Sequence, residues 1–95
     1  KIDLRLEPAH LALEALEPNP ARSSLAVSFS VPREGRATLD LIDVAGRNRV
    51  HQQLNARSGH HRVALEHVGS LPAGVYFLRL EQAGRVGVAR VCVAR

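Results

Sequence analysis

Residues 24–31 have the sequence SLAVSFSV, in which apolar side chains occupy every odd position. Neighbouring side chains of a β-strand lie on opposite faces, so Leu25, Val27 and Phe29 share one face with Val31. The serines and Ala26 lie on the other face. Because one face is apolar and the other is mostly polar, this segment is predicted to be a strand that is buried on one side only.

The same alternation recurs along the chain and is interrupted by glycine and proline at short intervals. It predicts strands over residues 37–43, 48–54, 60–65, 75–82 and 86–94, and a first strand around residues 11–15 that ends before Pro18. No window repeats apolar residues at helical spacing, so almost no helix is expected. About seven short strands, spaced roughly ten residues apart, predict an all-β fold, an Ig-like antiparallel β-sandwich of Greek-key type.

The alternation also assigns side chains to the two faces of each sheet. We expect the following side chains between the sheets: Phe29, Leu41, Tyr76, Leu78 and Leu80. We expect the following side chains outside: Ser28, Asp40 and Arg79. In the closing strand the apolar positions change phase between Val88 and Val91, which predicts a β-bulge there or burial on both faces.

Short polar segments mark the turns between the strands. Residues 32–35 and the pair Ala83-Gly84 are predicted turns, since proline and glycine interrupt the strands there. Residues 43–47 are predicted to form a tight turn, in which Asp43 accepts hydrogen bonds from nearby amides and Gly46 takes a left-handed conformation.

The 95-residue chain is long enough for one domain with its own core and too short for two. We place this domain at residues 10–95 and treat residues 1–9 as a linker from a preceding domain or an extra edge strand, because Pro8 separates the two parts. The chain opens at Lys1, as expected of a processed product or a piece of a longer protein. No apolar run approaches the roughly 18 residues of a membrane-spanning helix, so membrane insertion is not expected.

The chain carries 13 basic and 9 acidic residues, and all of the basic residues except Lys1 are arginine. The arginines are spread along the sequence and interleaved with acids, so no nucleic-acid-binding surface is predicted. Only Phe29, Tyr76 and Phe77 are aromatic, which gives no platform for stacking bases. The favoured interpretation is that the arginines lie on the solvent-exposed faces of strands. A weaker contact with anionic cell-surface polymers stays open.

Five histidines suggest a metal site, but their spacing does not support one: His10, His51, His60, His61 and His67. His60 and His61 are neighbours in a strand and face opposite ways. No cysteine lies at zinc-ligand spacing from the histidines. Asp40 and Asp43 offer too few oxygens for calcium. We therefore expect no metal and no cofactor.

No pattern of residues predicts catalysis. The chain has no Ser-His-Asp arrangement in a nucleophile-elbow context and no glycine-rich phosphate loop. Glu14 and Glu17 are expected in solvent. Cys92 is the only cysteine and is flanked by valines, which favours a small buried apolar side chain over a nucleophile and leaves no internal disulfide. An enzyme is therefore not expected.

Four segments stand in an order that is informative together: Pro18-Asn19-Pro20-Ala21, the alternating residues 25–31 followed by Pro32, residues 39–47 ending in Asp43-Val44-Ala45-Gly46-Arg47, and residues 71–80 beginning Leu71-Pro72-Ala73-Gly74-Val75-Tyr76. A valine-rich strand follows them. In this order they resemble the C-terminal sorting domain of the type IX secretion system (the Por secretion tail, type A). They are also similar to the related Ig-like domain of the flagellar hook-capping protein. The resemblance covers about residues 10–95.

The resemblance implies a non-catalytic C-terminal domain of a larger secreted protein. Such a domain is a folded signal for export across the outer membrane and for surface attachment. The implied partners are the outer-membrane secretion machinery, a surface protease and an upstream cargo domain. The implied location is the cell surface or the medium, reached through the periplasm. The residues that define the motif are Pro18, Asn19, Pro20, Asp43, Gly46, Arg47, Leu71, Pro72, Gly74, Val75, Tyr76, Leu78 and Leu80.

The resemblance further implies that the closing strand belongs to the region that the export machinery recognises. Arg90, Val91, Val93 and Arg95 are therefore candidate contacts. Family members commonly end in a strand that carries lysine, whereas this chain has arginines there.

A second class of function remains open on the residues alone. Any sandwich of this topology needs glycines at its turns and apolar side chains in its core, so the same residues fit a structural or adhesion Ig-like module that mediates protein–protein assembly at the cell surface. A position after a large cargo domain would favour sorting, and tandem copies would favour the structural module.

Overall fold

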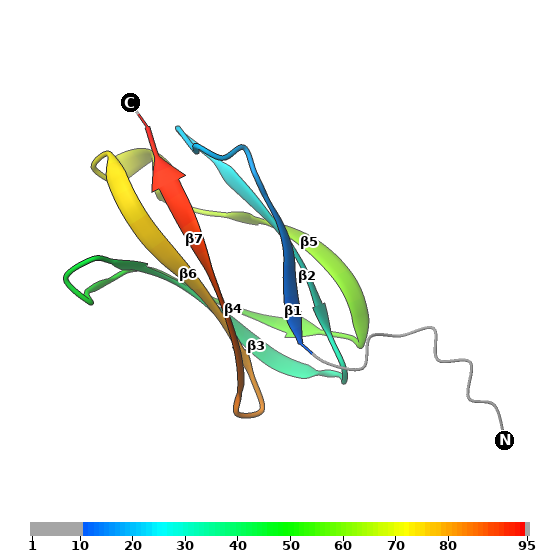
Figure 1. The fold of residues 1–95 in the computed structure, drawn as a ribbon. Helices are drawn as coiled ribbons and strands as arrows, with labels where there is room; N and C mark the ends of the chain where they lie inside the picture. The colour runs from blue at the N-terminus through cyan, green and yellow to red at the C-terminus, as the bar shows by residue number, and fades with distance from the viewer. Residues whose placement is uncertain (1–10, 95) are drawn as a thin grey trace, which may run out of the picture.

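The computed structural model describes residues 11–94 of the 95-residue chain. These residues form seven strands (Figure 1). Their bounds are β1 Ala12–Glu17, β2 Leu25–Val31, β3 Gly35–Asp43, β4 Asn48–Ala56, β5 Gly59–Leu65, β6 Gly74–Gln82 and β7 Arg85–Val93, with the short 3₁₀ turn η1 Val68–Ser70 before β6. The predicted segment 1–9, His10 and Arg95 lie outside the described residues.

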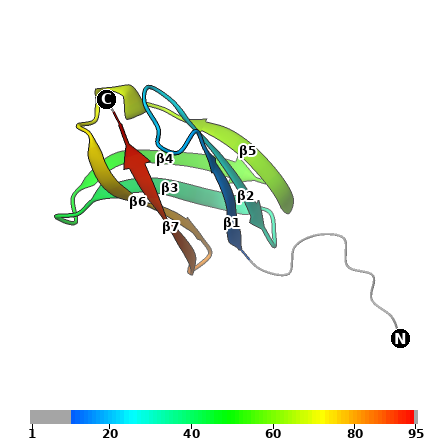
Figure 2. The ribbon, with the colours of Figure 1, turned by 45° about the horizontal axis from the view of Figure 1, so that its top comes forward.

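The strands form two sheets that pack face to face (Figure 2). One sheet has the order β1-β2-β5 and the other has the order β4-β3-β6-β7, and every ladder is antiparallel. The connections β2–β3, β4–β5 and β5–β6 pass from one sheet to the other, as in a Greek key. The predicted all-β antiparallel sandwich is confirmed.

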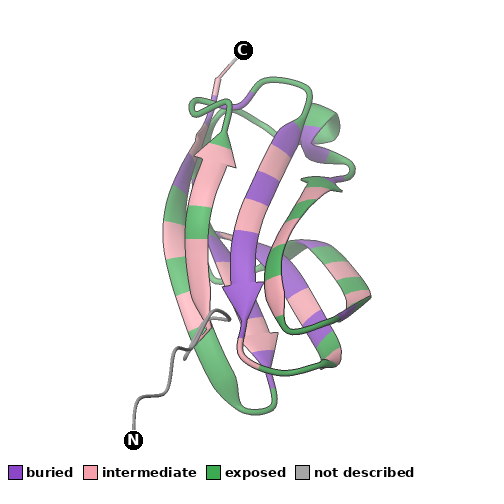
Figure 3. Cartoon of the chain, turned by 90° about the vertical axis from the view of Figure 1, so that its right-hand side faces the viewer, coloured by how far each residue is buried: buried purple, intermediate pink, exposed green. Residues whose placement is uncertain are grey.

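Apolar side chains at alternate positions fill the space between the sheets. Phe29 and its neighbours on β2 contribute from the three-stranded sheet, and Leu41 and Leu78 contribute from the four-stranded sheet. Buried residues accordingly alternate with more exposed ones along several strands (Figure 3). All five side chains predicted for the core are at most 3% exposed, so this prediction is confirmed.

The prediction that Asp40 lies outside is wrong in one respect, because the residue is buried. The residue does lie on the outer face of β3, but it is only 6% exposed because neighbouring strands cover it. The side-chain amide of Asn48 donates to Asp40 Oδ1 at 2.9 Å, His51 Nδ1 contacts the same oxygen, and Arg79 Nη1 lies 3.8 Å from Oδ2. A carboxylate inside this polar cluster keeps its hydrogen bonds while losing most of its contact with water.

The irregularity predicted in the closing strand is also wrong. β7 pairs with β6 in one continuous register from Gly74↔Val93 to Gln82↔Arg85. Gly87 and Ala89 take inward positions with little side chain, and the valines between them face outward. A Cβ atom at Gly87 would lie 3.1 Å from Leu11 Cδ2, so a larger residue at this inward position would require Leu11 to shift. The register shifts occur instead in β1 and between β3 and β4.

Two sheet edges meet without forming a ladder along each side of the sandwich. Along one side β4 lies near β5, and Gln52 joins them by donating to the carbonyl of Ala64 and accepting from the amide of Glu66. Along the other side β1 and β7 are in contact, but they belong to different sheets. The fold is therefore a sandwich of two open sheets, with edge strands β1, β5, β4 and β7, and not a closed barrel.

The difference between the two faces of β6 can be measured. Leu78→Ala should lower the free energy of unfolding by about 2–5 kcal/mol, because it removes apolar contacts and leaves a cavity. Arg79→Ala should lower it by less than about 1 kcal/mol, because the side chain is partly exposed, its pair with Glu81 lies at the surface, and Asp40 keeps its contacts with Asn48 and His51. Chemical denaturation of the chain measures both values. Equal losses would contradict the assignment of the two faces.

Candidate functional site

The connection between β3 and β4 is a tight turn built around Asp43. Its carboxylate oxygen Oδ1 accepts hydrogen bonds from the backbone N–H groups of Ala45 at 3.0 Å and Arg47 at 2.9 Å. The backbone closes the same turn through Asp43 N–Arg47 O and Gly46 N–Asp43 O, each at 2.9 Å. Gly46 has φ +85°, a conformation that glycine adopts at little cost. The predicted roles of Asp43 and Gly46 are confirmed.

The second oxygen of Asp43 joins the turn to two cations. Arg47 Nε lies 3.1 Å and Arg49 Nη1 lies 3.4 Å from Oδ2. The backbone N–H of Arg47 holds the pKa of Asp43 below its ordinary value, and the charge of Arg47 and the N–H of Ala45 act in the same direction against the effect of partial burial. The arrangement fixes a charged carboxylate inside the turn.

The loop before β6 lies beside this turn, because Asp43 pairs with Tyr76 in the β3–β6 ladder. The side chain of Leu71 is buried, and the hydroxyl of Tyr76 donates to the carbonyl of Pro72 at 2.6 Å. This hydrogen bond fixes the loop at the start of β6. The turn and the loop border a cleft of about 230 Å³, with Arg49 and Val75 among its lining residues.

The segment Pro18–Ala21 holds the end of the closing strand. The amide of Ala21 donates to the carbonyl of Cys92 at 2.8 Å, and the amide of Ala94 donates to the carbonyl of Ala21 at 2.7 Å. The side-chain oxygen of Asn19 accepts from the amide of Cys92 at 3.2 Å. Ala21 forms a parallel bridge with Val93 and is fully buried. We call this set of contacts the latch.

The register brings these segments to one end of the sandwich. Asp43 pairs with Tyr76, Gly74 pairs with Val93, and Val93 in turn bridges to Ala21. Figure 1 shows the end of β7 beside the start of β6. Segments that lie far apart in the sequence therefore meet there. We call the set formed by residues 19–21, 43–47, 72–76 and 91–94 the motif end.

Not all of the predicted site residues are exposed at the motif end. Leu78 and Leu80 are fully buried in the core, away from the motif end. Val91 and Val93 are also buried, so in the folded domain their side chains support the core and do not form a contact surface. Arg90 is exposed on β7, and Arg95 lies outside the described residues.

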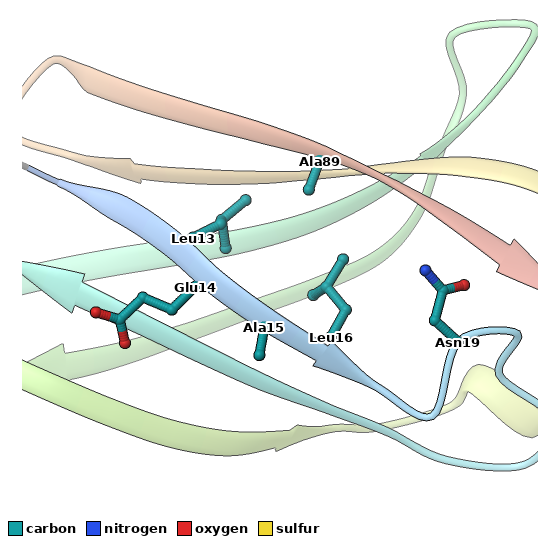
Figure 4. Close-up of a pocket in the computed structure, with 6 residues that line it drawn as sticks. All are labelled: Leu13, Glu14, Ala15, Leu16, Asn19 and Ala89. Atoms are coloured by element: carbon teal, nitrogen blue, oxygen red, sulfur yellow. The ribbon is translucent and has the colours of Figure 1, made fainter.

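A groove that was not predicted lies between β1 and β7 (Figure 4). Its volume is about 210 Å³. It is lined by Leu13, Glu14, Ala15, Leu16, Asn19 and Ala89. The only signal in the sequence is the small residue Ala89 at an inward position, which cannot be assigned without the register of β7. The ionisable side chain at the groove, Glu14, is paired with His60 Nδ1 at 2.6 Å.

The described residues contain no group of three or more histidine, cysteine, aspartate or glutamate side chains that could hold a metal ion. Instead, His51 contacts Asp40, His60 pairs with Glu14, and the His61 ring stacks on Phe29 with centroids 5.4 Å apart. Each of these histidines thus has a structural contact.

The charge inside the turn predicts a pH dependence of stability. Because the pKa of Asp43 is lower in the folded chain, its carboxylate stabilises the fold above the ordinary value of 3.8, and this contribution is lost as the pH falls through the lowered value. Asp43→Asn keeps an acceptor oxygen and removes the charge. The loss of stability caused by Asp43→Asn should be largest near neutral pH and should shrink as the pH falls below the ordinary value of 3.8. Denaturant titrations of both chains measure this difference. A difference that does not change with pH would contradict the role of the charge.

Comparisons with known proteins identify the family. Residues 16–94 match the profile of one family, Por_Secre_tail, described as the secretion system C-terminal sorting domain. A search of curated proteins finds no match. Within residues 11–94, no helix has the length and apolar character needed to cross a membrane. The match includes every segment of the motif end, and recognition by the secretion machinery follows from membership. Cargo of this system is secreted or attached to the cell surface. The chain belongs to the C-terminal sorting domains of the type IX secretion system and is a non-catalytic domain that directs secretion by that system.

Proposed function

We propose that the folded motif end is the part of this domain that the outer-membrane secretion machinery recognises. The cargo lies upstream in the same protein and reaches the periplasm before export. A surface protease then acts on the domain as the cargo is attached to the cell surface. We place the domain itself at residues 10–95.

The observation that carries this proposal is the convergence of the motif segments. A core needs apolar side chains at alternate positions, but it does not need an exposed Arg47 paired with Asp43 or an Asn19 side chain bonded to the closing strand. The Asp43–Arg47 pair fixes the 43–47 turn, and the Asn19 contact fixes the end of β7, where Val93 pairs with Gly74 and Ala21. A partner that binds this end therefore tests whether the whole chain has folded.

A fusion protein tests the sorting role. The complete chain is attached to the C-terminus of a periplasmic reporter in a host that has the type IX system. We expect the reporter on the cell surface or in the medium, whereas the reporter alone should stay in the periplasm. Protease treatment of intact cells measures the exposed fraction. If the folded fusion stays in the periplasm, the sorting proposal fails and the structural or adhesion module takes its place.

The latch gives a sharper test of the motif end. Asn19→Ala removes the acceptor for the amide of Cys92 and should lower the free energy of unfolding by only about 0.5–1.5 kcal/mol. Export of the fusion should fall because the end of the closing strand is no longer fixed. Asn55→Ala, at an exposed position of β4, is the matched control and should be exported normally. Equal export of the two variants would contradict a role for the latch in recognition.

A further inference from the structure

The exposed large apolar side chains of the described residues gather on one side of the sandwich. They are Val44 (76% exposed), Val75 (36%), Phe77 (37%), Val86 (48%) and Val88 (60%). Two belong to β6, two belong to β7, and Val44 lies in the turn beside Val75, where both line the same cleft. Single exposed apolar residues are normal, but a contiguous group marks an interaction surface.

The β6–β7 register shows that these side chains share one face. The outward pairs are Val75↔Cys92, Phe77↔Arg90, Arg79↔Val88 and Glu81↔Val86. Alternate residues of each strand point the same way. Phe77 therefore lies directly across from Arg90, and Val88 is the next outward residue along β7 from Arg90. We call the outward face formed by Val75, Phe77, Val86, Val88 and Arg90, with the paired Arg79 and Glu81 between them, the β6–β7 face.

The rest of the outer surface has a different character. On the three-stranded sheet, Arg62 pairs with Glu17 at 3.1 Å and His60 pairs with Glu14 at 2.6 Å. On the β4 side of the four-stranded sheet, the polar cluster around Asp40 covers the surface. In these regions the charged side chains just named are paired with one another. The β6–β7 face differs because it combines exposed apolar side chains with one charge that has no ion pair among the described residues.

That charge belongs to Arg90. The described residues include no ion pair for Arg90, whereas Arg79 on the neighbouring strand pairs with Glu81 at 3.4 Å. Arg90 is exposed among apolar neighbours. A carboxylate brought to it by a partner would be shielded from water by those neighbours, which strengthens a charge-assisted hydrogen bond.

The same charge opposes a second copy of this chain as the occupant. A twofold contact through this face would bring two Arg90 side chains and two chains of net charge +4 together. Like charges placed together at an interface oppose association. The complementary surface is apolar with an acidic group near its centre.

We propose that the β6–β7 face is a docking surface for a protein partner of the secretion machinery that presents a carboxylate surrounded by apolar side chains. Arg90 binds the carboxylate, and Phe77, Val86 and Val88 contact the apolar part. This proposal rests on the sorting function and adds a second contact region to the motif end. It also assigns a role to Val86 and Val88, whose outward position the core does not require.

The experiment uses the reporter fusion with substitutions that preserve the strand. Val86→Thr with Val88→Thr keeps β-branched side chains of similar shape and removes apolar surface. Arg90→Glu reverses the charge, and Arg90→Lys retains it. We expect the threonine pair and Arg90→Glu each to slow export roughly tenfold, equivalent to about 1.4 kcal/mol of binding free energy. Arg90→Lys should stay closer to the native rate.

Two matched controls separate this face from general surface effects. Ala64→Thr changes an exposed position on β5, and Arg36→Glu reverses an exposed charge at the start of β3. Both should be exported at the native rate, and denaturant midpoints of all purified variants should remain close to that of the native chain. Slowed export with the native midpoint supports docking at this face. An unchanged export rate for the threonine pair and Arg90→Glu overturns it while the sorting function stands.

Two further outcomes are decisive. If the native fusion itself is not exported, the sorting function fails and this proposal fails with it.

An anionic membrane could also bind arginine among apolar side chains, so the purified chain is sedimented with vesicles of an anionic phospholipid. We expect no binding above that of Arg36→Glu. Strong binding that is lost in the threonine pair would assign the face to lipid and overturn the proposed protein partner.

Discussion

Apolar contact between the two sheets is the constraint on which the rest of the structure depends. The described residues include neither a disulfide nor a long helix, so Phe29 and the leucines opposite it hold the sheets together. Because a strand alternates its faces strictly, this contact also fixes which residues point outward. The outward position of Phe77 follows from the inward position of Leu78. The core thereby determines the surface that other proteins meet.

Alternation made the strands and the core predictable, and it failed where size or partners decided the outcome. In β7 the change of phase among the apolar residues predicted a β-bulge or burial on both faces. The small residues Gly87 and Ala89 take the inward positions instead and lie against β1, which comes from the other end of the sequence. Asp40 appeared solvent-exposed because the residues that cover it are cross-strand neighbours. The alternation of apolar and polar residues predicts the face on which a side chain lies. The exposure of that side chain depends on which strands lie beside it, and the alternation does not predict the order of the strands.

The motif end was only partly accessible from the sequence for a similar reason. The turn at Asp43 is local, so its residues predicted its hydrogen bonds correctly. The latch joins Asn19 to Cys92 across most of the chain, and no spacing rule reveals that contact. The strand register nevertheless brings these distant segments together. Most of the motif residues thus belong to one end of the fold, although they are widely separated in the sequence, and Leu78 and Leu80 belong to the core.

The latch also has a consequence for protein synthesis. Ala21 forms backbone hydrogen bonds with Cys92 and Ala94, so the latch cannot form until residues 92–94 have left the ribosome. A chain that stops early lacks the partner strand that Ala21 needs, and β6 then becomes a bare sheet edge. If export depends on the motif end, a chain truncated before β7 lacks part of the recognised structure and is not exported. Because the latch joins residues 19–21 to residues 92–94, a partner that recognises the folded latch requires both segments to be present.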